Sequence, residues 1–160
     1  MTAAASWLPD GDLRLEYRFT GNPAALRVPA PAPAAAADGL WQHTCCEAFV
    51  AAVDTVDYRE FNLSPSTRWA AYRFAGYRQR DADWPVPGAP HIEFTPLDDG
   101  WRLVARVPAA LLPEARQLAV SLTAVLESAS GDLSYWALTH ADARPDFHLR
   151  SSFVLPLNRP

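Results

Sequence analysis

Residues 40–78 constrain the fold of this chain more than any other stretch. Within them, polar or aromatic side chains alternate with apolar ones over residues 45–53, 58–64 and 69–77. Because successive side chains of a β-strand point to opposite faces of a sheet, this period of two is typical of half-buried strands. The turn Ser64-Pro65-Ser66-Thr67 separates the last two segments. The stretch therefore predicts three short strands with one face rich in Trp, Tyr, Glu, Asn and Arg.

Alternation of this kind recurs along most of the chain, and no segment shows the 3.6-residue period of a convincing amphipathic helix. Further strands are predicted at residues 13–19, 92–97, 101–107, 118–126, 133–140 and 152–157. The turn Asp98-Asp99-Gly100 joins two of them in a hairpin, and residues 108–113 are expected to form one helical turn. About nine short strands with little helix predict an all-β fold, an antiparallel β-sandwich or jelly roll.

Composition is that of a globular protein, with 49% hydrophobic and 20% charged residues. A chain of 160 residues is long enough for one core, so residues 1–160 are predicted to be a single domain. Residues 29–38, PAPAPAAAAD, are predicted to be a strap or exposed loop, because proline favours extended geometry and cannot donate to a central ladder. The net charge of −4 argues against a nucleic-acid partner.

Cysteine usage and hydropathy bear on the cellular compartment. Cys45 and Cys46 are adjacent, and neighbours in a strand point to opposite faces, so a disulfide between them would be strained. The first residues lack the basic and apolar regions of a secretory signal, and no apolar run is long enough to span a bilayer. These features predict a reduced, cytoplasmic protein with no membrane partner.

Four segments together resemble the DOMON-like superfamily and, within it, the family-9-like carbohydrate-binding modules of a stand-alone bacterial type. They are LWQHTCCEAFV (40–50), YREFNLSPSTRWAAYRFAGYR (58–78), Gly100-Trp101, and SYWALTHADARPDFHLRSSFVLPL (134–157). The resemblance implies a β-sandwich that binds a small ligand, a sugar or a haem depending on the branch. Sugar-binding relatives are usually exported and attached to hydrolases, and haem-binding relatives use a Met and a His, whereas the only Met of this chain is Met1.

The strand over residues 58–64 supplies the centre of a predicted ligand face, where Glu60 and Asn62 share one side. On the next strand Trp69 and Arg73 share a side. A sugar presents C–H faces that stack on Trp and hydroxyl groups that Glu, Asn and Arg bind by directional hydrogen bonds. The predicted ligand-binding residues are Glu60, Asn62, Trp69, Arg73, Arg78 and, as a second platform, Trp136. The alternative is a Glu60–Arg73 ion pair with both Trp side chains in the core.

Four arginines, Arg68, Arg73, Arg78 and Arg80, alternate with tyrosines beside this face. Because Arg binds phosphate and carboxylate bidentately, the cluster indicates a sugar phosphate or nucleotide sugar. A solvated Arg face balanced by Asp81 and Asp83 is the alternative.

The segment THADARPDFHLR contains His140, Asp142, Asp146 and His148 within nine residues. His and carboxylate together suit zinc or another divalent ion, and an all-oxygen set would suit calcium. The alternative is a loop pinned by side-chain hydrogen bonds to the backbone. His43 beside Cys45 and Cys46 raises the question of a reactive thiol, against which stands the usual role of a buried Cys as a small hydrophobe.

These observations predict a non-catalytic module that binds a carbohydrate or sugar derivative, phosphorylated or not, without a cofactor, as a monomer or weak dimer. No carboxylate pair at a hydrolytic spacing and no cofactor loop is apparent. One alternative is a DOMON-type domain that binds a divalent metal such as Ca or Zn or, less favoured, a haem held by two of His43, His91, His140 and His148. Another is a protein-interaction domain that uses the strap or its edge strands and has no small ligand.

Overall fold

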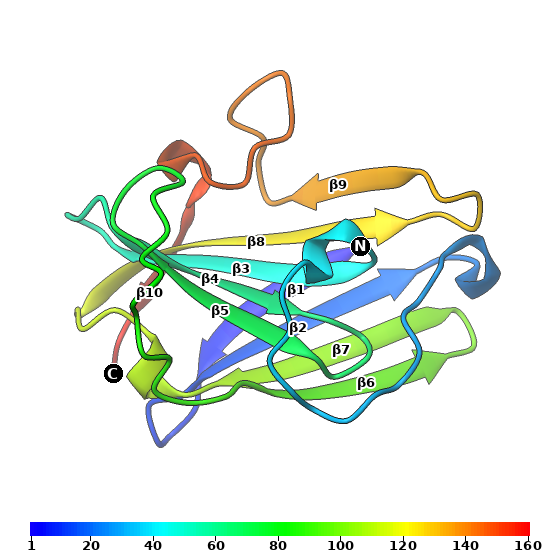
Figure 1. Cartoon of the computed structure of the whole chain (residues 1–160), viewed down its shortest axis with the longest axis horizontal. Helices are drawn as coiled ribbons and strands as arrows, with labels where there is room; N and C mark the ends of the chain where they lie inside the picture. Colours follow the sequence, from blue (N-terminus) through cyan, green and yellow to red (C-terminus); the bar gives the residue numbers. More distant parts are fainter.

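The computed structural model describes all residues, 1–160, and places ten strands in two antiparallel sheets (Figure 1). The smaller sheet has the order β1 (Thr2–Trp7), β2 (Leu13–Thr20), β7 (Gly100–Val107), β6 (His91–Leu97). The larger sheet has the order β10 (Leu155–Asn158), β8 (Gln117–Glu127), β3 (Cys45–Ala52), β4 (Tyr58–Leu63), β5 (Trp69–Phe74), and β9 (Leu133–Ala137) pairs with the remaining half of β8. The predicted all-β sandwich is confirmed.

Helical structure is limited to four short 3-10 turns: η1 (Pro23–Ala25), η2 (Leu40–Gln42), η3 (Ala109–Leu111) and η4 (Arg150–Ser152). The turn expected within residues 108–113 is confirmed as η3. None of these helical segments has the length and apolar character needed to cross a bilayer.

The core lies between the two sheets and follows the alternation of the sequence. On β7, Leu103, Ala105 and Val107 are fully buried, whereas Arg102 and Arg106 point to the other side of the sheet and are half-exposed. The larger sheet contributes apolar side chains of β4 and β8, among them Phe61, Leu63, Leu118 and Val120. One polar contact crosses this core: the Tyr17 hydroxyl donates to the carbonyl of Glu47 at 2.6 Å.

Strand β1 was not predicted, and several predicted strands end earlier in the structure. The sequence of β1, TAAASW, contains no β-branched apolar residue, and the strand pairs with β2 and packs Ala3, Ala5 and Trp7 against the core. The strand predicted at 69–77 stops at Phe74, and the one at 133–140 stops at Ala137. The strand predicted from 152 starts at Leu155, after η4.

The Pro/Ala segment 29–38 runs along the free edge of β5. The amide of Trp69 donates to the carbonyl of Ala35, and the amide of Ala37 donates to the carbonyl of Trp69. A further hydrogen bond joins Ala32 to Ser66. The strap therefore pairs with the first residue of β5, where an edge strand would otherwise offer unpaired backbone groups. It continues through Gly39, whose φ of 75° is in the left-handed region, into η2 and Trp41.

A second apolar cluster lies on the outer face of the larger sheet, away from the core. It consists of Phe49, Ala51, Tyr58, Ala70, Tyr72, Phe74 and Phe153. The chain after β9, orange to red in Figure 1, leaves the sheet as a long loop and brings Phe147 and Phe153 onto this cluster. One face of the larger sheet is thus partly covered by loops, and the gap among them is the candidate site.

Candidate ligand pocket

A cavity of about 510 Å³ opens on the outer face of the larger sheet. Its floor is made by side chains of the sheet, namely Glu47 and Phe49 of β3, Glu60 of β4, Tyr72 and Phe74 of β5, and Val125 of β8. Its walls come from loops and from β9: Asp38, Gly39, Trp41, Arg78, Arg80, Tyr135, Pro145, Phe147 and His148. The volume lies within the range of about 300–1,000 Å³ that is usual for small-molecule sites. We call this cavity the main pocket.

Strand register explains why these side chains meet. Glu60 pairs directly with Tyr72, and Tyr58 pairs with Phe74, so alternate residues of β4 and β5 share the pocket face. Glu47 of β3 is opposite Thr123 of β8 in the same way. The floor is therefore rigid sheet, while the walls belong to segments far apart in the sequence.

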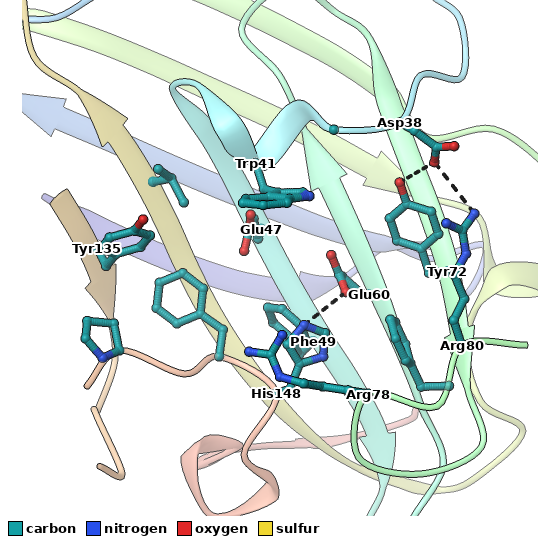
Figure 2. Close-up of a pocket in the computed structure, with 15 residues that line it drawn as sticks. Asp38, Trp41, Glu47, Phe49, Glu60, Tyr72, Arg78, Arg80, Tyr135 and His148 are labelled. Atoms are coloured by element: carbon teal, nitrogen blue, oxygen red, sulfur yellow. Dashed lines mark hydrogen bonds and ion pairs between the residues drawn. The ribbon is translucent and has the colours of Figure 1, made fainter. Parts of the chain in front are cut away.

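Glu47 is a buried carboxylate in the middle of the floor, with only 3% of its surface exposed. Thr123 Oγ1 donates to its Oε2 at 3.4 Å, and no basic side chain contacts it. Burial, reinforced by the charge of Glu60, raises the pKa of Glu47 to about 8. Figure 2 shows the carboxylate beneath the ring of Trp41, pointing into the cavity.

Glu60 is the second buried carboxylate, with 6% of its surface exposed. Asn62 Nδ2 donates to its Oε1 at 2.7 Å, and its Oε2 lies 3.7 Å from His148 Nε2. Burial raises the pKa of Glu60 to about 7, although the hydrogen bond from Asn62 and the charge of Arg78 act in the opposite direction. Like Glu47, it has no arginine in contact with it.

A chain of hydrogen bonds holds the ring of His148 in place. The amide of Arg78 donates to the Tyr58 hydroxyl at 3.1 Å, and that hydroxyl is 2.7 Å from His148 Nδ1. The hydroxyl oxygen accepts from the amide, and either the phenolic hydrogen or a ring hydrogen on Nδ1 makes the second hydrogen bond, depending on the tautomer. Burial lowers the pKa of His148 to about 4, and the charge of Arg78 acts in the same direction. The imidazole is thus neutral near pH 7.

Two arginines lie at the rim, and each already has a carboxylate partner. Arg78 donates to Asp146 at 2.9 Å. Arg80 lies 3.6 Å from Asp38 and stacks on Tyr72, with its guanidinium carbon 4.1 Å from the ring centroid. The charges at the rim are balanced, whereas those of the floor are not.

Two exposed aromatic side chains flank the opening. Trp41 on η2 is 48% exposed and Tyr135 on β9 is 41% exposed. In Figure 2 Tyr135 lies at the β9 side of the cavity, across from Asp38, Tyr72 and Arg80, while Trp41 covers Glu47. Open aromatic faces next to polar groups are the surface that a sugar ring requires.

The structure brings together only part of the predicted ligand face. Glu60 and Arg78 line the main pocket, and Asn62 lies beside Glu60, fully buried and outside the lining. Trp69 and Arg73 point to the opposite face of β5, because their partners in β4 are Leu63 and Arg59. The expectation that they join Glu60 is therefore wrong.

Each of these two residues has another partner. Trp69 packs against the core between the sheets. Arg73 Nε lies 3.8 Å from Asp81, so the alternative of a Glu60–Arg73 pair is also wrong, and the predicted balance of an arginine by Asp81 is found. Of the other clustered arginines, Arg68 is exposed outside the main pocket and Arg80 lines it.

Trp136 is also on the wrong side for the predicted role. It is directly opposite Ala124, a core residue, whereas its neighbour Tyr135 is opposite the pocket residue Val125. Trp136 is 45% exposed and borders a small separate hollow with Met1 and Leu138. Tyr135 takes the place beside the pocket that was predicted for Trp136.

The four predicted metal ligands do not come together, and no group of three or more His, Cys, Asp or Glu side chains is arranged to hold a metal. Asp146 accepts from the amide of His148, and Asp142 accepts from the amide of Ala143. The ring of His140 packs near Phe147. The geometry is that of the alternative, a loop pinned by hydrogen bonds to its own backbone.

The cysteines have no nearby base. Cys45 and Cys46 are free and fully buried, and burial raises the pKa of both thiols well above the ordinary value. His43 pairs instead with Glu127, at 2.7 Å. A reactive thiol is therefore not formed here.

Several pocket residues were not predicted: Asp38, Trp41, Glu47, Phe49, Tyr72, Tyr135 and Phe147. Only Glu47 carried a signal of its own, since it is the one charged residue in the otherwise apolar strand CCEAFVAA. The others depend on register or on loop paths that bring distant segments to one place.

No family model and no curated protein matches this chain. Two solved structures share its fold. A proposed carbohydrate-binding protein from Bacteroides uniformis superposes with a TM-score of 0.65 at 17% identity, over 89% of this chain and 71% of the other. A family 9 carbohydrate-binding module from Caldicellulosiruptor kristjanssonii, solved in complex with glucose, superposes with a TM-score of 0.58 at 14% identity, over 98% of this chain and 74% of the other. The fold is thus a carbohydrate-binding-module-like β-sandwich.

Proposed function

We propose that this protein is a non-catalytic, DOMON-like module of the family-9-like type that binds a sugar in the main pocket. The observation that carries the proposal is the combination of exposed aromatic faces, Trp41 and Tyr135, with the polar floor groups Glu47 and Glu60 in one open cavity. The shared fold with two carbohydrate-binding proteins supports it.

The chemistry of the lining fits a pyranose ring. Its C–H faces stack on the exposed ring of Trp41, which excludes water without requiring a charged ligand. Its hydroxyl groups donate to the carboxylates of Glu47 and Glu60 and accept from the guanidinium groups at the rim. Hydrogen bonds to charged groups contribute about 1.5–3 kcal/mol each when the partner is desolvated, so two or three of them determine which sugar binds.

A phosphorylated sugar is the second candidate, because Arg78 and Arg80 both line the pocket. A phosphate at the rim would have to compete with Asp146 and Asp38 for these guanidinium groups. A panel that contains both neutral sugars and sugar phosphates distinguishes the two candidates.

Binding is tested by isothermal titration calorimetry and tryptophan fluorescence with neutral sugars, amino sugars and sugar phosphates. We expect binding by the native protein and a loss of affinity of about tenfold or more in Trp41→Ala. Trp136→Ala is the matched control, since that indole is equally exposed but lies outside the main pocket, and its affinity should be unchanged.

Two results would overturn the proposal. One is the absence of binding to every sugar of the panel, and the other is an equal effect of the two tryptophan variants. Recovery of the bound sugar chemically unchanged tests the non-catalytic role, and formation of a product contradicts it.

A further inference from the structure

We infer that the sugar bound in the main pocket carries a free, positively charged amino group, which is placed between the carboxylates of Glu47 and Glu60. Amino sugars are therefore preferred over their neutral parent sugars. This inference rests on the proposed function and specifies its ligand class.

Glu47 has few hydrogen-bond partners for a buried carboxylate. Its carboxylate is 3% exposed, faces the cavity, and receives a single hydrogen bond of 3.4 Å from Thr123 (Figure 2). A buried carboxylate normally has several donors or a cationic partner, because its desolvation is otherwise uncompensated. An ammonium group supplies three donors and a positive charge. The amino group of a sugar would thus supply the hydrogen-bond donors and the positive charge that Glu47 lacks.

The other charged groups of the main pocket do not neutralise Glu47 and Glu60, because they have partners of their own. Arg78 and Arg80 are each paired with an acid of their own, Asp146 and Asp38. His148 Nε2 lies 3.7 Å from Glu60 Oε2 and the ring is neutral near pH 7, and burial together with the hydrogen bond to Asp38 raises the pKa of Tyr72. The remaining carboxyl, guanidinium and imidazole groups of the lining are those of Glu47 and Glu60 themselves. The floor consequently holds two carboxyl groups without a cationic partner, and an ammonium group is the ligand group that pairs with their ionised forms.

Aromatic side chains surround the two carboxyl groups of the main pocket. The ring of Phe49 lies on the floor and the exposed rings of Trp41 and Tyr135 flank the opening. Aromatic faces attract cations through their quadrupole, most strongly where water is excluded, and they also stack on the C–H face of a sugar. One ligand that has both a pyranose ring and an ammonium group uses both properties.

The protonation of Glu47 and Glu60 before a ligand binds gives the inference a measurable consequence. Near pH 7 the Glu47 carboxyl, with a pKa of about 8, and the Glu60 carboxyl, with a pKa of about 7, are partly protonated because burial disfavours their charged forms. An ammonium ligand favours the ionised forms, so the protein releases protons when it binds. A neutral sugar that uses the protonated carboxyls releases none.

The experiment is isothermal titration calorimetry of the full chain at pH 6.5 with glucosamine, glucose, N-acetylglucosamine and glucose 6-phosphate, in two buffers of different ionisation enthalpy. We expect glucosamine to bind at least about tenfold more tightly than the other three sugars, with net release of protons. Glu47→Gln and Glu60→Gln keep the shape of the side chain but not the charge, and we expect the ratio of glucosamine to glucose affinity to fall to about one in both. Thermal unfolding of each variant verifies that it is folded.

The outcomes separate the inference from the proposed function. Equal binding of glucose and glucosamine, or a preference that survives in both Gln variants, overturns the inference and leaves the sugar-binding module intact. Tightest binding of glucose 6-phosphate overturns it in favour of an anionic ligand at Arg78 and Arg80. No binding by any of the four sugars, nor by the galactose and mannose series with the same substituents, overturns both.

Discussion

Glutamate side chains on the outer faces of the two sheets have opposite electrostatic surroundings, and their pKa values shift in opposite directions. On the smaller sheet, Glu16 accepts hydrogen bonds from Arg102 at 2.8 Å and from Arg14, and these contacts lower its pKa to about 2. On the larger sheet, Glu47 has no basic partner, and burial raises its pKa to about 8. Both residues lie in the middle of a strand, so the difference comes from their surroundings and not from the local backbone.

This difference supports the proposal that the ligand binds on the outer face of the larger sheet. The charged groups of the smaller sheet are balanced in place, as in the pairing of Arg106 with Asp10 and Asp12, and they remain in contact with solvent. They need no ligand to be stable. The carboxyl groups of Glu47 and Glu60 are buried without a basic partner, and groups of this kind are concentrated at binding and catalytic sites.

The largest expected effect tests whether the pocket face is packed like a core. Phe49 is 1% exposed and its ring lies 5.9 Å from Phe153 and 5.2 Å from His148. Phe49→Ala should cost about 3–5 kcal/mol, as is usual for a buried Phe. Arg106→Ala on the other outer face should cost much less than Phe49→Ala, because the side chain is half-exposed. Urea unfolding of both variants measures the difference, and equal losses would show that the two faces are not distinct.

A second prediction concerns the pH dependence of stability. A carboxyl whose folded pKa is raised binds more protons in the folded state, so stability falls as pH rises from about 4.5 to about 8 for Glu47. The lowered pKa of His148 acts in the opposite direction only below its ordinary value of 6.5. Between pH 6.5 and 8 the free energy of unfolding should therefore fall, by about 2 kcal/mol.

Glu47→Gln should remove most of that fall, and Glu16→Gln should leave it unchanged. Urea titrations at several pH values between 6.5 and 8 provide the measurement. A native protein whose stability is flat across this interval would mean that Glu47 ionises freely, and the contrast between the two faces would fail.

The smallest effect is expected for Glu16 itself. The lowered pKa of Glu16 gives stability that is present above about 4.5 and is lost as pH falls toward about 2. Because the side chain is 30% exposed, Glu16→Gln should cost less than about 1 kcal/mol at neutral pH, and its cost should shrink in acid. Thermal unfolding at pH 7 and pH 3 checks both statements, and a cost that grows in acid would contradict them.

Much of the fold was predictable because alternation is a local signal. The strands around Leu15, Phe61 and Leu122 have strong apolar side chains at every second position, and each of them is found. Strand β1 was not predicted, because its alanines have little preference for a strand and its position depends on pairing with β2.

The site was less predictable because it depends on register and on loops. Alternation correctly placed Glu60 and Asn62 on one face, but it could not decide whether Trp69 or Tyr72 of β5 would join them. The pairing of Glu60 with Tyr72 decides this, and a shift of one residue would have exchanged the two faces. The positions of Trp41 and His148 follow from loops that join distant parts of the chain, and no local pattern reports such contacts.

The hydrogen bond from Tyr17 to the carbonyl of Glu47 has a consequence for engineering. It fastens the strand that bears Glu47 to the opposite sheet, independently of the segments that form the rim. Residues 38–41 and 76–80 can accordingly be exchanged by loop grafting while β3 stays hydrogen-bonded to the opposite sheet. New ligand preferences can thus be selected in this scaffold without redesigning its interior.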